Sequence, residues 1–114
     1  RVHFARTLLQ IDHQYDSIKN RYMFLDEPTA NLDLLFELQL IRLLKAKAEK
    51  GIGVLLIIHD LNLASKFSDK IAILKKGKLS AFGEPFEVFK SKTLSDIFGL
   101  AMHVDLKTLK VTYY

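Results

Sequence analysis

Two adjacent carboxylates, Asp26 and Glu27, directly follow a short apolar run at residues 22–25. An apolar run that ends in acids is typical of a buried strand with charge at its carboxyl end, where open α/β sheets place their ligands. Paired acids there suit a hydrated magnesium ion (Mg2+) and an activated water, the two requirements of phosphoryl transfer. We therefore predict that Asp26 holds the metal mostly through water and that Glu27 polarises the attacking water. The alternative is a strand end with two solvated acids.

A second apolar run, residues 53–58, ends in His59 and Asp60. Taken in isolation, His59 is better explained as a core histidine at a strand end. Asp60 precedes a short helical pattern and is predicted to be an N-cap. Asp33 precedes a longer helical pattern, so an N-cap role is predicted for it too.

These residues need a scaffold of alternating strands and helices. We predict strands at residues 22–25 and 54–58 and helices at 34–50 and 61–67. The longer helix has one apolar stripe, formed by Leu34, Leu38, Ile41, Leu44 and Ala48, and Gly51 is placed to end it. This order predicts an α/β fold with parallel core strands.

The remaining segments are shorter. Residues 1–10 are predicted to be the end of a helix, and residues 12–21 are predicted to form a polar loop. Residues 70–74 and 78–82 surround Lys75-Lys76-Gly77 and predict a β-hairpin. Pro85 opens a short helix. Ser91 is predicted to cap a further helix that ends at Phe98-Gly99, and the tail, residues 102–114, is predicted to hold two strands.

Composition limits the class of protein. The chain has 114 residues, of which 49% are hydrophobic, enough for one domain with a core. It has no cysteine, which excludes disulfides and cysteine zinc sites. No apolar run approaches the ~20 residues of a membrane span. The net charge of +4 comes from scattered lysines, not a clustered stripe, so nucleic-acid binding is not expected. The lysines are predicted to form a solvated surface, one that faces anionic lipid or a membrane partner.

The string YMFLDEPTANLD, residues 22–33, resembles the Walker B segment and D-loop of ABC-type ATPases. Residues 53–60, ending in His59-Asp60, resemble the switch-histidine segment of the same family. The resemblance implies that Glu27 and His59 are catalytic, with His59 contacting the γ-phosphate of ATP and positioning Glu27. It also implies that Asp26 holds Mg2+ and that Asp33 crosses a dimer interface to the other subunit's phosphate loop. The D-loop departs from the usual pattern at Ala30, where the family often has serine.

Other family motifs are absent from these residues. There is no G-x-x-x-x-G-K-[ST] (Walker A) segment to cradle phosphates. Residues 1–6, RVHFAR, resemble the helix that follows the ABC signature, which would lie before Arg1. We therefore expect residues 1–114 to be a partial nucleotide-binding domain, the carboxyl-terminal half, and to be inactive alone.

The resemblance further implies an ATPase that works as a homodimer with transmembrane permease subunits, peripheral on the cytoplasmic face of the inner membrane. The HDLNLA segment and the ending GEPFEVFKSKTLSDIFGLAMHV resemble ATPase subunits of bacterial iron-siderophore, haem and cobalamin importers. The polar loop at residues 12–21 favours haem (hemin) import. The alternatives are a fragment of a non-import ABC ATPase, of the exporter, translation or DNA-repair type, or an inert self-associating fragment.

Overall fold

The computed structural model describes residues 21–113. The helix expected at residues 1–10 and almost all of the loop expected at residues 12–21 lie outside the described residues. The chain divides into two compact units, Arg1–His59 and Asp60–Tyr114, and each is described by itself.

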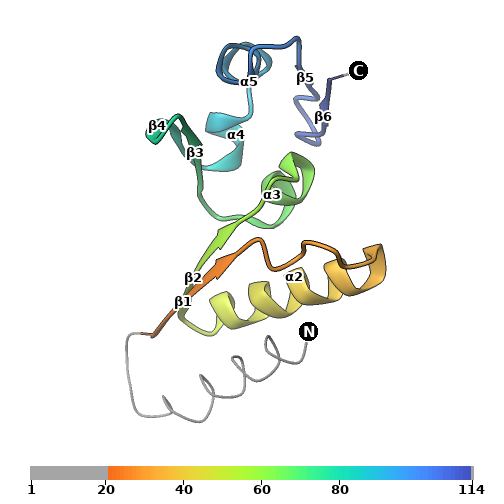
Figure 1. Cartoon of the computed structure of the whole chain (residues 1–114), viewed down its shortest axis with the longest axis vertical. Coiled ribbons are helices and arrows are strands. Elements are labelled where there is room, and N and C mark those ends of the chain that lie inside the picture. Colours follow the sequence, from red (N-terminus) through yellow and green to blue (C-terminus); the bar gives the residue numbers. More distant parts are fainter. Residues whose placement is uncertain (1–20, 114) are drawn as a thin grey trace. The chain divides into compact units, whose positions relative to one another are not determined.

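The described part of the first unit is a parallel strand pair joined by a helix (Figure 1). Strand β1 (Arg21–Asp26) pairs with β2 (Ile52–Ile57), and α2 (Leu34–Glu49) connects them. The register places Asp26 opposite Ile57, so the carboxyl ends of both strands lie at the same edge. The predicted α/β class with parallel core strands is confirmed, although each strand begins earlier than the apolar pattern indicated.

One face of this strand pair is buried against α2. The cluster beneath it contains Met23, Leu44 and Ile52, which are 3–5% exposed. Alternate side chains point the other way, and Tyr22 and Phe24 are 81% and 64% exposed. Parallel sheets are usually covered on both faces, and within the described residues α2 covers one face of this strand pair.

Helix α2 differs from its predicted stripe at one end. Ile41 and Leu44 are buried, but Leu34 is 71% exposed because the buried part of α2 begins only at mid-helix. The helix starts at Asp33, whose carboxylate accepts from the Phe36 N–H at 3.1 Å. It ends before Gly51, whose φ of +96° is a left-handed conformation that glycine adopts without steric cost.

The second unit begins with α3 (Leu61–Phe67) and the antiparallel hairpin of β3 (Ile71–Lys75) and β4 (Lys78–Gly83). Helices α4 (Pro85–Val88) and α5 (Ser91–Phe98) follow, and β5 (His103–Val104) pairs antiparallel with β6 (Val111–Thr112). The hairpin turns through Lys76 and Gly77, both at positive φ, as a two-residue turn requires. Over the described part of the chain, no helix is both long and apolar enough to cross a bilayer.

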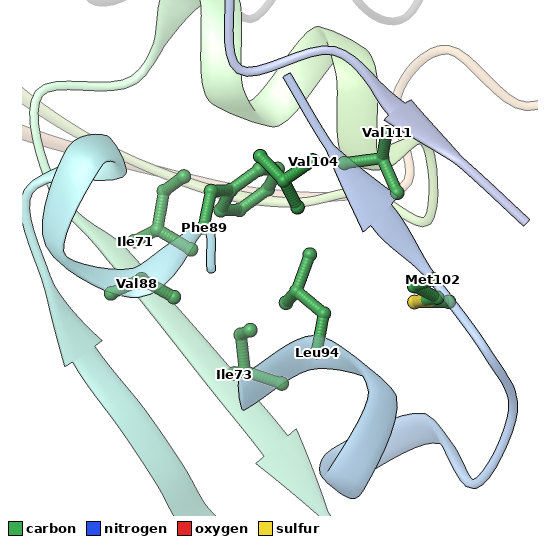
Figure 2. Close-up of a cluster of buried hydrophobic side chains, with 8 residues drawn as sticks. All are labelled: Ile71, Ile73, Val88, Phe89, Leu94, Met102, Val104 and Val111. Atoms are coloured by element: carbon green, nitrogen blue, oxygen red, sulfur yellow. The ribbon is translucent and has the colours of Figure 1, made fainter. Parts of the chain in front are cut away.

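The core of this unit draws on nearly every element (Figure 2). It consists of eight buried residues: Ile71, Ile73, Val88, Phe89, Leu94, Met102, Val104 and Val111. The last three belong to the tail, so β5 and β6 complete this core. The two strands predicted in the tail are thereby confirmed.

The prediction for Ser91 is wrong. The N-cap of α5 is Lys90, and Ser91 is the first helical residue. Its hydroxyl instead accepts from the Val104 N–H at 2.9 Å, and one turn later the Ser95 hydroxyl accepts from the Met102 N–H at 2.9 Å. Residues four apart share one face of a helix, so the two serines satisfy the backbone of the tail as it passes α5.

The turn between β5 and β6 depends on Asp105. Its carboxylate accepts from the N–H groups of Lys107, at 2.8 Å, and Thr108, at 3.0 Å. The Thr108 N–H, followed by that of Lys107, lowers the pKa of the Asp105 carboxyl below its ordinary value. The turn is therefore stabilised when Asp105 is ionised.

We expect Asp105→Ala to lower the thermal midpoint of the chain near neutral pH and to have less effect in acid. The folded pKa of Asp105 is depressed, so its stabilisation is complete above the unfolded value of about 3.9 and is lost as the pH falls through the folded pKa. Midpoints of both proteins from about pH 7 to about pH 2 check this. Asp96→Ala, which removes an exposed pair with Lys92, is the control. A gap between wild type and variant that widened in acid would contradict the assignment.

Candidate functional site

The first unit brings Glu27 and His59 together. Glu27 follows the last residue of β1, and His59 lies just beyond the end of β2. Because the two strands are parallel and in register, both residues emerge at the same edge. There His59 Nε2 contacts Glu27 Oε1. The glutamate side chain is 41% exposed and the imidazole 83%, so the pair faces solvent.

The backbone at Glu27 is held in an uncommon conformation. Its φ is +49°, a left-handed value that few non-glycine residues adopt. Its N–H donates to the Ile57 carbonyl at 2.8 Å, and its carbonyl accepts from the Ala30 N–H at 3.1 Å. Such strain persists where neighbouring bonds determine the conformation, and it is concentrated at functional sites. The two hydrogen bonds fix the backbone of Glu27 beside the end of β2, and this backbone sets the direction of the Glu27 side chain.

The contact is suited to positioning. An exposed side-chain contact of this kind contributes about 0–1 kcal/mol to stability, so the Glu27–His59 contact does little for the fold. A carboxylate has two oxygens, each with two acceptor sites. Glu27 can therefore hold His59 through Oε1 and accept a hydrogen bond from a water as well. An oriented carboxylate, a water and an imidazole together are the elements of general-base chemistry with a nearby hydrogen-bond donor.

Asp26 is the exposed last residue of β1 and lies opposite Ile57 in the register. No group of three or more His, Cys, Asp or Glu residues that could hold a metal occurs among residues 21–113. The single exposed carboxylate of Asp26 cannot supply the several protein oxygens that hold a metal ion stripped of its water. It does fit magnesium, which keeps several waters and takes one or two protein carboxylates.

The two aspartates before helices are both N-caps. Asp33 caps α2 through Phe36, and Asp60 accepts from the N–H groups of Asn62 at 3.0 Å and Leu63 at 3.1 Å. The cap predicted for Asp60 is confirmed. For Asp33, capping is compatible with a second role across a dimer interface, which stays a prediction.

Comparison with known proteins gives a consistent result. The chain is 38% identical over 104 residues to the hemin import ATP-binding protein HmuV of Photobacterium damselae subsp. damselae, covering 91% of this chain and 38% of that protein. It is homologous to the carboxyl-terminal part of ABC importer ATP-binding subunits. HmuV of Rhizobium meliloti (strain 1021) is 39% identical over 106 residues, 93% of this chain and 40% of that protein. The chain thus spans about two fifths of the length of these curated relatives.

The fold agrees with this homology to ABC ATPases. A putative metal-chelate type ABC transporter in an inward-facing conformation aligns with a TM-score of 0.67 and 25% identity, covering 82% of this chain and 40% of the other. No protein-family model matches the chain.

One contributor to the site was not visible in the sequence. The Ile57 carbonyl holds the Glu27 N–H, but every residue carries a backbone carbonyl, so no side-chain pattern marks it. Asp26, Glu27 and His59 stay predicted site residues, and the sequence marks them because acids and histidine at the ends of apolar runs are uncommon.

Proposed function

We propose that this chain supplies the water-activating edge of an ATP-hydrolysing site in an ABC importer. The observation that carries the proposal is the contact between Glu27 and His59 at the shared carboxyl edge of two parallel strands. Glu27 orients and deprotonates the water that attacks the γ-phosphate of ATP. His59 holds the Glu27 carboxylate and donates a hydrogen bond toward the charge that develops on the phosphate.

Asp26 is the residue that would hold Mg2+, through water, at the same edge. When bound, the ion supplies neutralisation of phosphate charge. Asp33 lies at the start of α2, where it is proposed to reach the phosphate loop of a second subunit in a homodimer. The 114 residues alone carry no Walker A segment, so we expect them to be inactive by themselves.

In the cell, the proposed assembly is two such ATPase subunits docked to transmembrane permease subunits, peripheral on the cytoplasmic face of the inner membrane. Relatives named for hemin import and a metal-chelate type transporter support import of haem or another iron or metal chelate as the driven process.

The test needs a protein with a complete nucleotide site. We define the chimera as residues 1–114 joined to the amino-terminal region of the Rhizobium meliloti relative that precedes the matched residues. Magnesium-dependent ATP binding and hydrolysis are measured on the chimera and on the 114 residues alone. Activity of the chimera only is expected. Hydrolysis by the 114 residues alone would mean that phosphates are held without a phosphate loop, and the proposal would fail.

His59→Ala is expected to lower the kcat of the chimera about 10²-fold, because it removes both the partner of Glu27 and a donor to the transferring phosphate. The KM for ATP should change much less. His103→Ala, which removes an exposed histidine on β5, is the matched control and should leave kcat unchanged. Equal effects of the two substitutions would remove His59 from the mechanism.

A further inference from the structure

The β3–β4 hairpin has two different faces. On one face, Ile71 and Ile73 of β3 belong to the buried cluster of the second unit (Figure 2). Alternate residues of a strand point to opposite faces, so Leu74 lies on the other face, together with its register partner Leu79. Leu74, Leu79 and Phe82 are each 61–69% exposed. Three large apolar side chains of one hairpin are therefore turned toward solvent.

The turn of the same hairpin carries three lysines within four residues. Lys75 and Lys78 lie opposite one another in the register, and Lys76 lies between them in the sequence. All three are exposed, and within residues 21–113 none of them takes part in an ion pair. At the base of the hairpin, in contrast, Lys70 Nζ lies 3.8 Å from Glu84 Oε1. Like charges directly opposite on paired strands repel, and an external anionic surface would relieve that repulsion.

The charge of this hairpin decides which partner suits its exposed face. In a symmetric dimer through this face, the lysines of one copy would meet the lysines of the other. Lysines on a strand edge also disfavour pairing with a further chain. A solvated turn would explain the lysines but not the apolar side chains next to them. Apolar side chains beside clustered lysines match a bilayer with anionic headgroups, because the apolar groups enter the interface while the ammonium groups stay among the headgroups.

We propose that the β3–β4 hairpin binds the surface of an anionic lipid bilayer. Leu74 and Leu79 enter the interface between headgroups and acyl chains. Lys75, Lys76 and Lys78 contact the headgroups. This activity is separate from ATP hydrolysis, and it requires neither a nucleotide nor a permease subunit.

The first experiment tests the charge by co-sedimentation of the 114-residue chain with lipid vesicles. One set of vesicles is phosphatidylcholine alone, and the other also contains phosphatidylglycerol, which is anionic. Binding to the anionic vesicles only is expected. Replacing the three turn lysines by glutamine should weaken this binding about a hundredfold, because each lysine near an anionic surface strengthens binding about fivefold.

The matched control replaces three exposed lysines outside the hairpin by glutamine and so lowers the net charge equally; they are Lys90, Lys107 and Lys110. This control should weaken binding far less than the turn variant. Equal losses in the two triple variants would indicate a general attraction of positive charge and would overturn the proposal. Failure of the wild-type chain to bind the anionic vesicles, or equal binding to both sets, would overturn it as well.

The second experiment tests the apolar contact with single substitutions. Leu74→Ser should weaken binding to the anionic vesicles about tenfold, because a leucine side chain gains at least that factor when it leaves water. Leu106→Ser removes a leucine that is 89% exposed in the turn between β5 and β6, and it should leave binding unchanged. Circular dichroism verifies that both variants keep the wild-type fold. Equal binding by the two variants would exclude Leu74 from the interface.

Sedimentation velocity without lipid tests the competing partner, a second copy of the chain. The proposal predicts that Leu74→Ser leaves the oligomeric state of the chain unchanged. A wild-type oligomer that Leu74→Ser converts to a monomer would show that this face joins copies of the chain, and the proposal would fail.

Discussion

Glu27→Gln is expected to abolish ATP hydrolysis by the chimera while leaving ATP binding intact. Glutamine keeps the length and shape of the side chain but has no basic carboxylate. The backbone that aims residue 27 is held by the Ile57 carbonyl and the Ala30 N–H, neither of which the substitution touches. A positioned general base is worth about 10²–10⁴ in rate, so kcat should fall by that factor.

The measurement is single-turnover hydrolysis together with ATP affinity. The variant should retain bound, unhydrolysed ATP after removal of free nucleotide. Glu49→Gln, at the exposed end of α2, makes the same charge change away from the site and should behave as wild type. Rapid turnover by Glu27→Gln would exclude Glu27 as the base, even if binding were normal.

Phe89→Ala is expected to destabilise the second unit by about 3–5 kcal/mol, the usual cost of removing a buried phenylalanine ring. Phe89 is 1% exposed and lies in the cluster that joins β3, α4, α5 and the tail (Figure 2). Its removal leaves a cavity that several elements border, so the loss should spread across Asp60–Tyr114.

Phe86→Ala is the matched control, because Phe86 belongs to α4 and is 62% exposed. Chemical denaturation of both variants, with hydrogen exchange to locate the change, compares them directly. Phe86→Ala should alter the free energy of unfolding by less than about 0.5 kcal/mol. Similar losses for the two residues would show that the core does not lie where the structure places it.

Most of the secondary structure could be read from neighbouring residues. The predicted bounds of α3 match its observed bounds. The end of α2, the hairpin turn and the start of α4 lie at Gly51, Lys76-Gly77 and Pro85, where the backbone preferences of these residues predict them. The strands were found with bounds one or two residues off, because an apolar run marks burial and not the extent of hydrogen bonding.

Ser91 shows where prediction from neighbouring residues fails. Serine before a helical pattern is a common N-cap, so the local interpretation was reasonable. Its hydroxyl is taken instead by Val104, a residue of the tail that reaches α5 only when the core forms. Leu34 is exposed although it belongs to the predicted apolar stripe, because such a stripe does not reveal how far along the helix burial begins.

The sequence by itself determined the order of the elements, the parallel class of the first strand pair and the residues able to do chemistry. Caps, turns and periodicity depend on residues a few positions apart, so they can be recognised in the sequence without knowledge of the fold. Only the tertiary structure decided that Glu27 meets His59 and that Asn62 meets Val111. Those contacts depend on strand register and on core packing, which are set jointly by side chains from several elements.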